Sequence, residues 1–161
     1  LERARHAGVP AVVVSRAKLG AAYSRTLLEI LCAYHIDLIV LAGFLTILDT
    51  AVIQAYPRRI LNVHPSLIPS FCGEGFYGLK VHEAVLAYGV KVTGATVHYV
   101  NEIPDGGEII AQKAVRVLPD DTPETLQQRV MVEAEWVLLP QAVADCCARI
   151  AQEEEKTHEM P

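Results

Sequence analysis

The chain has 161 residues, of which 52% are hydrophobic and 20% charged, and its formal net charge is −5. This composition excludes a disordered chain and predicts a single globular domain over residues 1–161, long enough to bury a core. The negative net charge and the lack of a basic cluster argue against a nucleic-acid partner. The richest apolar run, residues 38–48, is too short to span a membrane.

The cysteines predict a reducing compartment. None is spaced as CxxC and two are adjacent, which is typical of reduced thiols rather than of a disulfide framework. No signal peptide opens the chain, so we expect a cytoplasmic location. A zinc site that combines Cys72 with His64, His82 and His98 lacks the usual ligand spacing, and we expect no metal. The four cysteines are Cys32, Cys72, Cys146 and Cys147.

Predicted strands and helices alternate along the first part of the chain. The near-continuous apolar run of residues 36–42 is typical of a parallel strand that is buried on both faces. The alternation predicts an α/β fold with a three-layer, doubly wound, mostly parallel sheet, in which ligands bind beyond the carboxyl ends of the strands. In chain order, the expected elements are a helix end over residues 1–7 closed by Gly8, a strand over 11–14, a helix over 24–34, a strand over 36–42, a short helix from Asp49 or Thr50 to Tyr56, and a strand over 60–64.

The second part of the chain is expected to add two strands between helices. Thr122, with Glu124 and Thr125, is typical of the start of a helix, and Pro140 is expected to interrupt that helix. The acidic residues 152–161 are expected to form a frayed tail. The expected elements are a helix over residues 79–88, strands over 94–100 and 108–117, and the long terminal helix.

Two polar residues interrupt the strand over residues 60–64. Asn62 and His64 are two positions apart, so both side chains leave the strand on one face. A polar pair on a buried strand costs free energy unless it is hydrogen-bonded, and Pro65 ends the strand directly after it. An amide donor and an imidazole at a strand end are plausible parts of a reaction centre. A hydrogen-bonded pair with a purely structural role remains the alternative.

Two loops lie where ligands of such a fold bind. The apolar residues 43–48 follow the strand over residues 36–42. Asp105-Gly-Gly107 puts a carboxylate on a tight turn whose backbone a ligand can approach closely. Gly73, Gly75 and Gly78 match GxGxxG, but a proline-containing loop precedes them, so we reject a dinucleotide site.

Taken together, these motifs resemble the glycinamide ribonucleotide formyltransferase family, which is folate-dependent and acts in purine synthesis. The resemblance covers most of the chain, and its motifs occur in the family's order and spacing. The matching motifs are Leu41-Ala-Gly-Phe44, Asn62-Val-His-Pro-Ser-Leu67, Gly94-Ala-Thr-Val-His98, Asp105-Gly-Gly107 and Asp121-Thr122, and the loop from Phe71 to His82 is similar to a bacterial subset.

The resemblance implies transfer of a formyl group from 10-formyltetrahydrofolate to the amine of glycinamide ribonucleotide. Asn62 would donate a hydrogen bond to the oxyanion, and His64 would be a second donor, best when charged. Asp105 would lie beside His64, favour its charged form, and help to carry the amine proton to the leaving nitrogen. His98 would support Asp105, although an inward-facing structural histidine remains the alternative.

The resemblance also implies the ligand contacts. The folate ring would lie between two loops, on Phe44, Leu45, Thr46, Ile47, Leu48, Val100, Asn101 and Ile103. Val63 and Glu135 would contact the nucleotide, with Glu133 as the alternative register. Thr46 stands where many members carry an arginine for the glutamate tail of folate, and Trp136 replaces a more common histidine. The resemblance leaves a homodimer open.

The start of the chain departs from the family, whose members open with a strand, a glycine-rich loop that holds phosphate, and a second strand. We therefore expect a chain that is partial at its N-terminus and poorly active by itself. Formyltetrahydrofolate deformylase, a hydrolase with the same Asn/His/Asp set, is one alternative function. A non-catalytic folate-binding fragment is another, and a third treats the polar set as structural.

Overall fold

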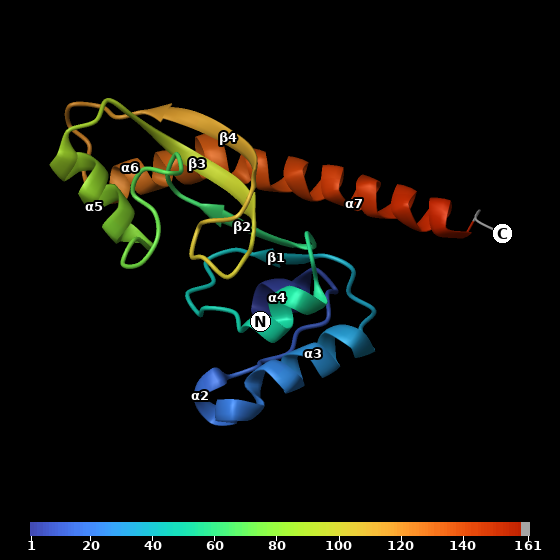
Figure 1. Ribbon diagram of the computed structural model, residues 1–161. Coiled ribbons are helices and arrows are strands. Elements are labelled where there is room, and N and C mark those ends of the chain that lie inside the picture. The colour runs from blue at the N-terminus through green and yellow to red at the C-terminus, as the bar shows by residue number, and fades with distance from the viewer. Residues whose placement is uncertain (159–161) are drawn as a thin grey trace. The chain divides into compact units, whose positions relative to one another are not determined.

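The computed structural model describes residues 1–158 (Figure 1). The chain forms two compact units, an N-terminal unit, Leu1–Ile36, and a larger main unit that begins at Asp37. The composition predicts one domain over residues 1–161, and this stays a prediction.

The N-terminal unit is helical. Gly8 has a φ of +67°, as expected of a residue that closes a helix. The strand predicted over residues 11–14 is wrong, because these residues are irregular and Val12 and Val13 are exposed. A strand needs a neighbour to share hydrogen bonds, and no described strand pairs with this segment. The elements are α1 (Glu2–His6), α2 (Arg16–Leu19), the 3₁₀-helix η1 (Gly20–Ala22) and α3 (Tyr23–Ala33), so the helices expected at residues 1–7 and 24–34 are confirmed.

The main unit contains a four-stranded sheet in the order β1-β2-β3-β4. Its strands are β1 (Ile39–Leu41), β2 (Ile60–His64), β3 (Val92–Tyr99) and β4 (Ile109–Arg116). Its helices are α4 (Thr50–Ala55), α5 (Leu79–Tyr88), α6 (Pro123–Val130), the π-helix η2 (Met131–Glu135) and α7 (Trp136–His158). The strands and helices expected after residue 36 are therefore confirmed, with shifts at their ends. The burial expected on both faces of the strand over residues 36–42 is wrong, because β1 is only partly buried and Val40 is 38% exposed.

The sheet is mixed. β1 and β2 are parallel, whereas β3 runs antiparallel to β2 and β4 runs antiparallel to β3. The predicted α/β class is confirmed, but a parallel majority does not hold among the described strands. Apolar content predicts that a segment is a strand, but it does not determine the direction in which the strand runs. The short connection over residues 100–108 joins β3 to β4 as a hairpin, which requires antiparallel pairing.

One face of the sheet carries the hydrophobic core. α5, α6 and η2 pack against that face, and α7 runs along β3 and β4 (Figure 1). Val63 packs against this core. Because side chains alternate along a strand, Asn62 and His64 project from the opposite face of β2. The buried core cluster consists of Val85, Ala95, Val115, Leu126, Val130 and Ala134.

The terminal helix is irregular before Pro140 and not at it. α7 continues through Pro140, and the irregular turn is η2. Proline cannot donate to the carbonyl four residues earlier, which here belongs to Trp136, the first residue of α7. The missing bond thus falls where the hydrogen-bond pattern already changes. The tail expected to fray over residues 152–161 is helical to His158, and residues 159–161 lie outside the described residues.

α7 is the longest described helix, with 23 residues. Nowhere in residues 1–158 does a helix combine the length and apolar character that a membrane span requires.

Candidate functional site

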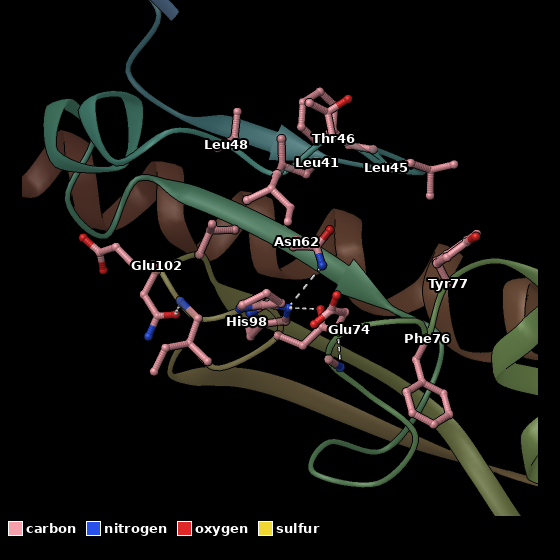
Figure 2. Close-up of a pocket in the computed structure, with 18 of the residues that line it drawn as sticks. Leu41, Leu45, Thr46, Leu48, Asn62, Glu74, Phe76, Tyr77, His98 and Glu102 are labelled. Carbon is pink, nitrogen blue, oxygen red and sulfur yellow. Dashed lines mark hydrogen bonds and ion pairs between the residues drawn. The ribbon is translucent and has the colours of Figure 1, made fainter. Parts of the chain in front are cut away.

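A pocket of about 620 Å³ opens in the main unit, beside the end of β1 (Figure 2). Its walls come from the loop after β1, from β2 and β3, and from the turn that precedes β4. Apolar side chains form most of the surface, as is usual for a small-molecule site. All eight residues expected around a folate ring line the pocket: Phe44, Leu45, Thr46, Ile47, Leu48, Val100, Asn101 and Ile103.

The polar residues predicted for catalysis gather at this pocket. Asn62, His98 and Asp105 line it. The Nδ2 atom of Asn62 lies 3.2 Å from Nε2 of His98, and that Nε2 atom lies 3.6 Å from Oδ1 of Asp105. Two regions far apart in the sequence, β2 and the end of β3 with the turn after it, therefore meet in one cluster.

His64 belongs to the same cluster but is buried behind the pocket wall, with 4% of its surface exposed. Its Nδ1 atom lies 3.4 Å from Oδ2 of Asp105, and its Nε2 atom lies 2.8 Å from the carbonyl oxygen of Phe71. Both neighbours are acceptors, so only the doubly protonated ring can donate to both. The ring thus has an acceptor atom beside each of its two nitrogens.

Asp105 is held by its neighbours as a carboxylate. Burial opposes its ionisation, but the His98 ring, the N–H of Gly73 and the charge on His64 outweigh burial and hold the pKa of Asp105 below its usual range. The Gly73 N–H donates to Oδ2 at 2.9 Å. Asp105 has a φ of +53°, a left-handed conformation that aspartate tolerates better than most residues.

His98 is placed by an irregularity in the β3–β4 pairing. Val97 pairs with Ala111 but His98 pairs with Ile109, so β4 has one extra residue, Ile110, at this point. Such a bulge changes the direction of nearby side chains and is common beside active sites. The Nδ1 atom of His98 lies 2.8 Å from the carbonyl oxygen of Tyr99.

The sequence did not predict one wall of the pocket. Residues 73–77 line it, together with Leu41, Ile53, Glu102 and Pro104. Figure 2 shows the side chains of Phe76 and Tyr77 beside the end of β2. The signals for this wall were the glycine spacing of residues 73–78, which we rejected as a dinucleotide motif, and the similarity of the loop from Phe71 to His82 to a bacterial subset of the family.

The residues expected to contact a nucleotide do not line this pocket. Val63 packs against the core, and Glu135 lies in η2. Burial raises the pKa of the Glu135 carboxyl, whereas Glu133 is exposed. Of the two glutamates, Glu135 is therefore the one that the fold partly buries.

The residues considered for zinc do not form a metal site in the described part of the chain. Residues 1–158 contain no group of three or more His, Cys, Asp or Glu side chains that could hold an ion. His82 is fully buried on α5, and burial, with the nearby charge of His64, lowers its pKa to about 4. Burial and the charge of Asp105 raise the pKa of the Cys72 thiol.

The arrangement suits acyl chemistry. An amide N–H and a charged imidazole can stabilise negative charge that develops on a carbonyl oxygen. A carboxylate beside them can accept or relay a proton. The apolar walls provide room for a flat ring next to these groups.

Comparison with known proteins gives a consistent result. Residues 1–143 match the family described as Formyl transferase. The phosphoribosylglycinamide formyltransferase of Arabidopsis thaliana, described as chloroplastic, is 44% identical over 158 residues, which are 96% of this chain and 54% of that protein. The chain spans about half the length of such curated relatives.

Solved structures show the same relationship. Glycinamide ribonucleotide transformylase 1 from Symbiobacterium toebii superposes with a TM-score of 0.81 at 43% identity, over 88% of this chain and 65% of that one. A formyltetrahydrofolate deformylase from Pseudomonas syringae is more distant, with a TM-score of 0.68 at 28% identity, over 82% of this chain and 45% of that one.

Proposed function

Since this chain belongs to the formyl transferase family, we propose that it transfers a formyl group from 10-formyltetrahydrofolate to the amine of glycinamide ribonucleotide, in purine biosynthesis. The observation that carries the proposal is the Asn62, His64 and Asp105 cluster beside a largely apolar pocket. The relatives named for this reaction support the choice of substrates.

In the proposed reaction, the amine of the nucleotide attacks the formyl carbon and forms a tetrahedral oxyanion. Asn62 donates an amide hydrogen to that oxygen. His64 is the second donor, and its Nε2–H must exchange the Phe71 carbonyl for the substrate oxygen. Each such donor is worth about a hundred- to a thousandfold in rate.

Collapse of this intermediate breaks the bond between the formyl carbon and N10 of the folate. The attacking amine loses a proton and N10 gains one, so that tetrahydrofolate and the formylated nucleotide leave. Asp105 relays this proton through water and keeps His64 charged. His98 lies beside Asp105, with its Nε2 atom 3.6 Å from Oδ1. No metal is needed for these steps.

The ligands occupy different regions in this proposal. The folate ring lies among the eight pocket residues from Phe44 to Ile103 named above, beside Asn62. Val63 and Glu135 contact the nucleotide, and the buried carboxyl of Glu135 accepts hydrogen bonds from ribose hydroxyl groups. We further propose a cytoplasmic location, supported by four free thiols, and a homodimer, which light scattering tests directly.

Formyl transfer measured with Asn62→Ala and His64→Ala tests the proposal. Each substitution is expected to lower the rate at least about a hundredfold, because each removes one donor to the oxyanion. His6→Ala, an exposed histidine on α1, is the matched control and should leave the rate unchanged. The assay compares this chain with each variant. Equal rates for all variants would refute the assignment.

Deformylation is the second candidate function, because the deformylase from Pseudomonas syringae shares the fold. It predicts release of formate without the nucleotide. The third possibility is that the chain binds folate without catalysis. In that case folate binds, and neither product forms when the nucleotide is saturating.

A further inference from the structure

We infer that His98 is a positioning residue that determines which end of the Asn62 amide faces the pocket. The inference rests on the proposed function, since this amide is the proposed donor to the formyl oxygen. It gives His98 a role other than support of Asp105, because His98 here acts through Asn62.

The carbonyl oxygen of Tyr99 selects the tautomer of His98. The carbonyl oxygen of Tyr99 lies 2.8 Å from Nδ1 of the ring. A carbonyl can only accept, so Nδ1 carries the hydrogen. In the neutral ring, Nε2 is then an acceptor. The side chain is 2% exposed, so bulk water does not compete for either nitrogen.

The amide of Asn62 turns its nitrogen toward His98. Its Nδ2 atom lies 3.2 Å from Nε2 of His98, and Figure 2 shows the nitrogen facing the ring and the oxygen directed away. Only the NH₂ end can donate to an accepting nitrogen, whereas the oxygen end would place two acceptors together. One NH₂ hydrogen is used by His98, and the other remains available to a ligand in the pocket.

Asp105 also approaches Nε2 of the His98 ring. Oδ1 of Asp105 lies 3.6 Å from Nε2, farther than the Asn62 nitrogen at 3.2 Å, so Asp105 is the competing partner of Nε2 and Asn62 is the nearer one. If Nε2 carried a hydrogen, the ring would donate to Asp105 and repel the NH₂ group of Asn62. The amide would then turn over, and the oxyanion site would lose its donor.

The backbone fixes the position of the Tyr99 carbonyl oxygen, which selects this tautomer. A Cβ on Gly107 would lie 1.7 Å from the carbonyl oxygen of Tyr99, so only glycine allows this close approach. The extra residue in β4 at Ile110 lies next to the same contact. The tautomer is therefore set by main-chain geometry rather than by a mobile side chain.

A double-mutant cycle tests the inference. His98→Phe keeps a ring but removes the acceptor, and it should lower kcat at least about tenfold by misorienting an oxyanion donor. His98→Gln offers a carbonyl oxygen to the Asn62 amide and should restore most of that loss. Asn62→Ala with His98→Phe should be no slower than Asn62→Ala alone, since both act through one group. Losses that multiply in the double variant would overturn the inference.

His82→Phe is the matched control, because His82 is also a fully buried histidine and its ring nitrogens have no hydrogen-bond partner among the described residues. Its effect should multiply with that of Asn62→Ala. A long-range ¹H–¹⁵N spectrum of the histidine-labelled protein gives a second test that needs no activity. A hydrogen on Nδ1 of His98 is expected, and a hydrogen on Nε2 would overturn the inference. If the chain does not transfer a formyl group but the spectrum still shows a hydrogen on Nδ1 of His98, the proposed function is wrong and the inferred orientation of Asn62 stands.

Discussion

Gly107 contributes to the site although it has no side chain. Gly107→Ala would push a Cβ against the Tyr99 carbonyl, which holds Nδ1 of His98. Because the backbone at Gly107 or at Tyr99 must move, we expect a loss of about 2–4 kcal/mol in the free energy of unfolding, measured by denaturant titration.

Gly106→Ala is the control for that substitution. A Cβ there would lie 2.6 Å from Cγ2 and 2.7 Å from Cβ of Ile103, a residue of the same loop that is 65% exposed. We expect a smaller loss than for Gly107→Ala, because an exposed loop residue moves rather than a strand carbonyl. Equal losses for Gly106→Ala and Gly107→Ala would contradict the close contact at Tyr99.

Glu135 and Glu133 give a second prediction for single residues. If Glu135 contacts the nucleotide, Glu135→Gln should raise KM for glycinamide ribonucleotide about tenfold or more, because it removes a hydrogen bond to a charged group. KM for the folate should stay unchanged. Glu133→Gln should change neither constant. Steady-state kinetics with each substrate varied decides between the two, and the opposite result would assign the contact to Glu133.

The sequence predicted the residues of the site better than their contacts. Period two in β2 placed Asn62 and His64 on one face, and the Asp-Gly-Gly sequence indicated a carboxylate on a tight turn at Asp105. The hydrogen bond between Asn62 and His98 could not be predicted, because it depends on the pairing of β2 with β3. The Phe71 carbonyl beside His64 was equally hidden, since backbone atoms leave no sequence signal.

At the scale of elements, α6 is anchored by an ion pair next to its N-terminus. Arg129 donates to both carboxylate oxygens of Asp121, at 2.7 and 2.5 Å, and to the carbonyl oxygen of Arg116 in β4. Hydrogen bonding with Arg129 lowers the pKa of Asp121 to about 2. The pair thus joins α6, its capping turn and the end of β4.

This ion pair predicts a pH dependence of stability. The pKa of Asp121 is lower in the folded chain than its usual 3.8, so its contribution is complete above that pH and is lost as the pH falls toward 2. Asp121→Asn should cost about 1–2 kcal/mol at neutral pH, and the difference from the parent chain should shrink below pH 3.8. Thermal melts across this range measure it, with the exposed Asp120→Asn as control. A difference that does not change with pH would contradict the assignment.

Local patterns predicted some elements and not others for physical reasons. α5 has the predicted bounds, because Gly78 and Gly89 flank it at positive φ. The segment over residues 11–14 has the composition of a strand, but without a described pairing partner it is irregular. Likewise, η2 was not foreseen, because a single extra residue in a helix leaves the apolar pattern nearly unchanged.

For the whole molecule, we propose that the pocket and its polar cluster transfer a formyl group to an amine rather than to water. Both chemistries use an amide, an imidazole and a carboxylate, so the residues alone do not separate them. The difference lies in the acceptor, and family membership with relatives named for the transferase favours the amine.

The most direct test mixes 10-formyltetrahydrofolate, labelled in the formyl group, with the protein in the presence and absence of glycinamide ribonucleotide. Our account predicts one labelled nucleotide for every tetrahydrofolate released, and no formate when the nucleotide is omitted. Release of labelled formate at the same rate without the nucleotide would contradict it and identify a hydrolase.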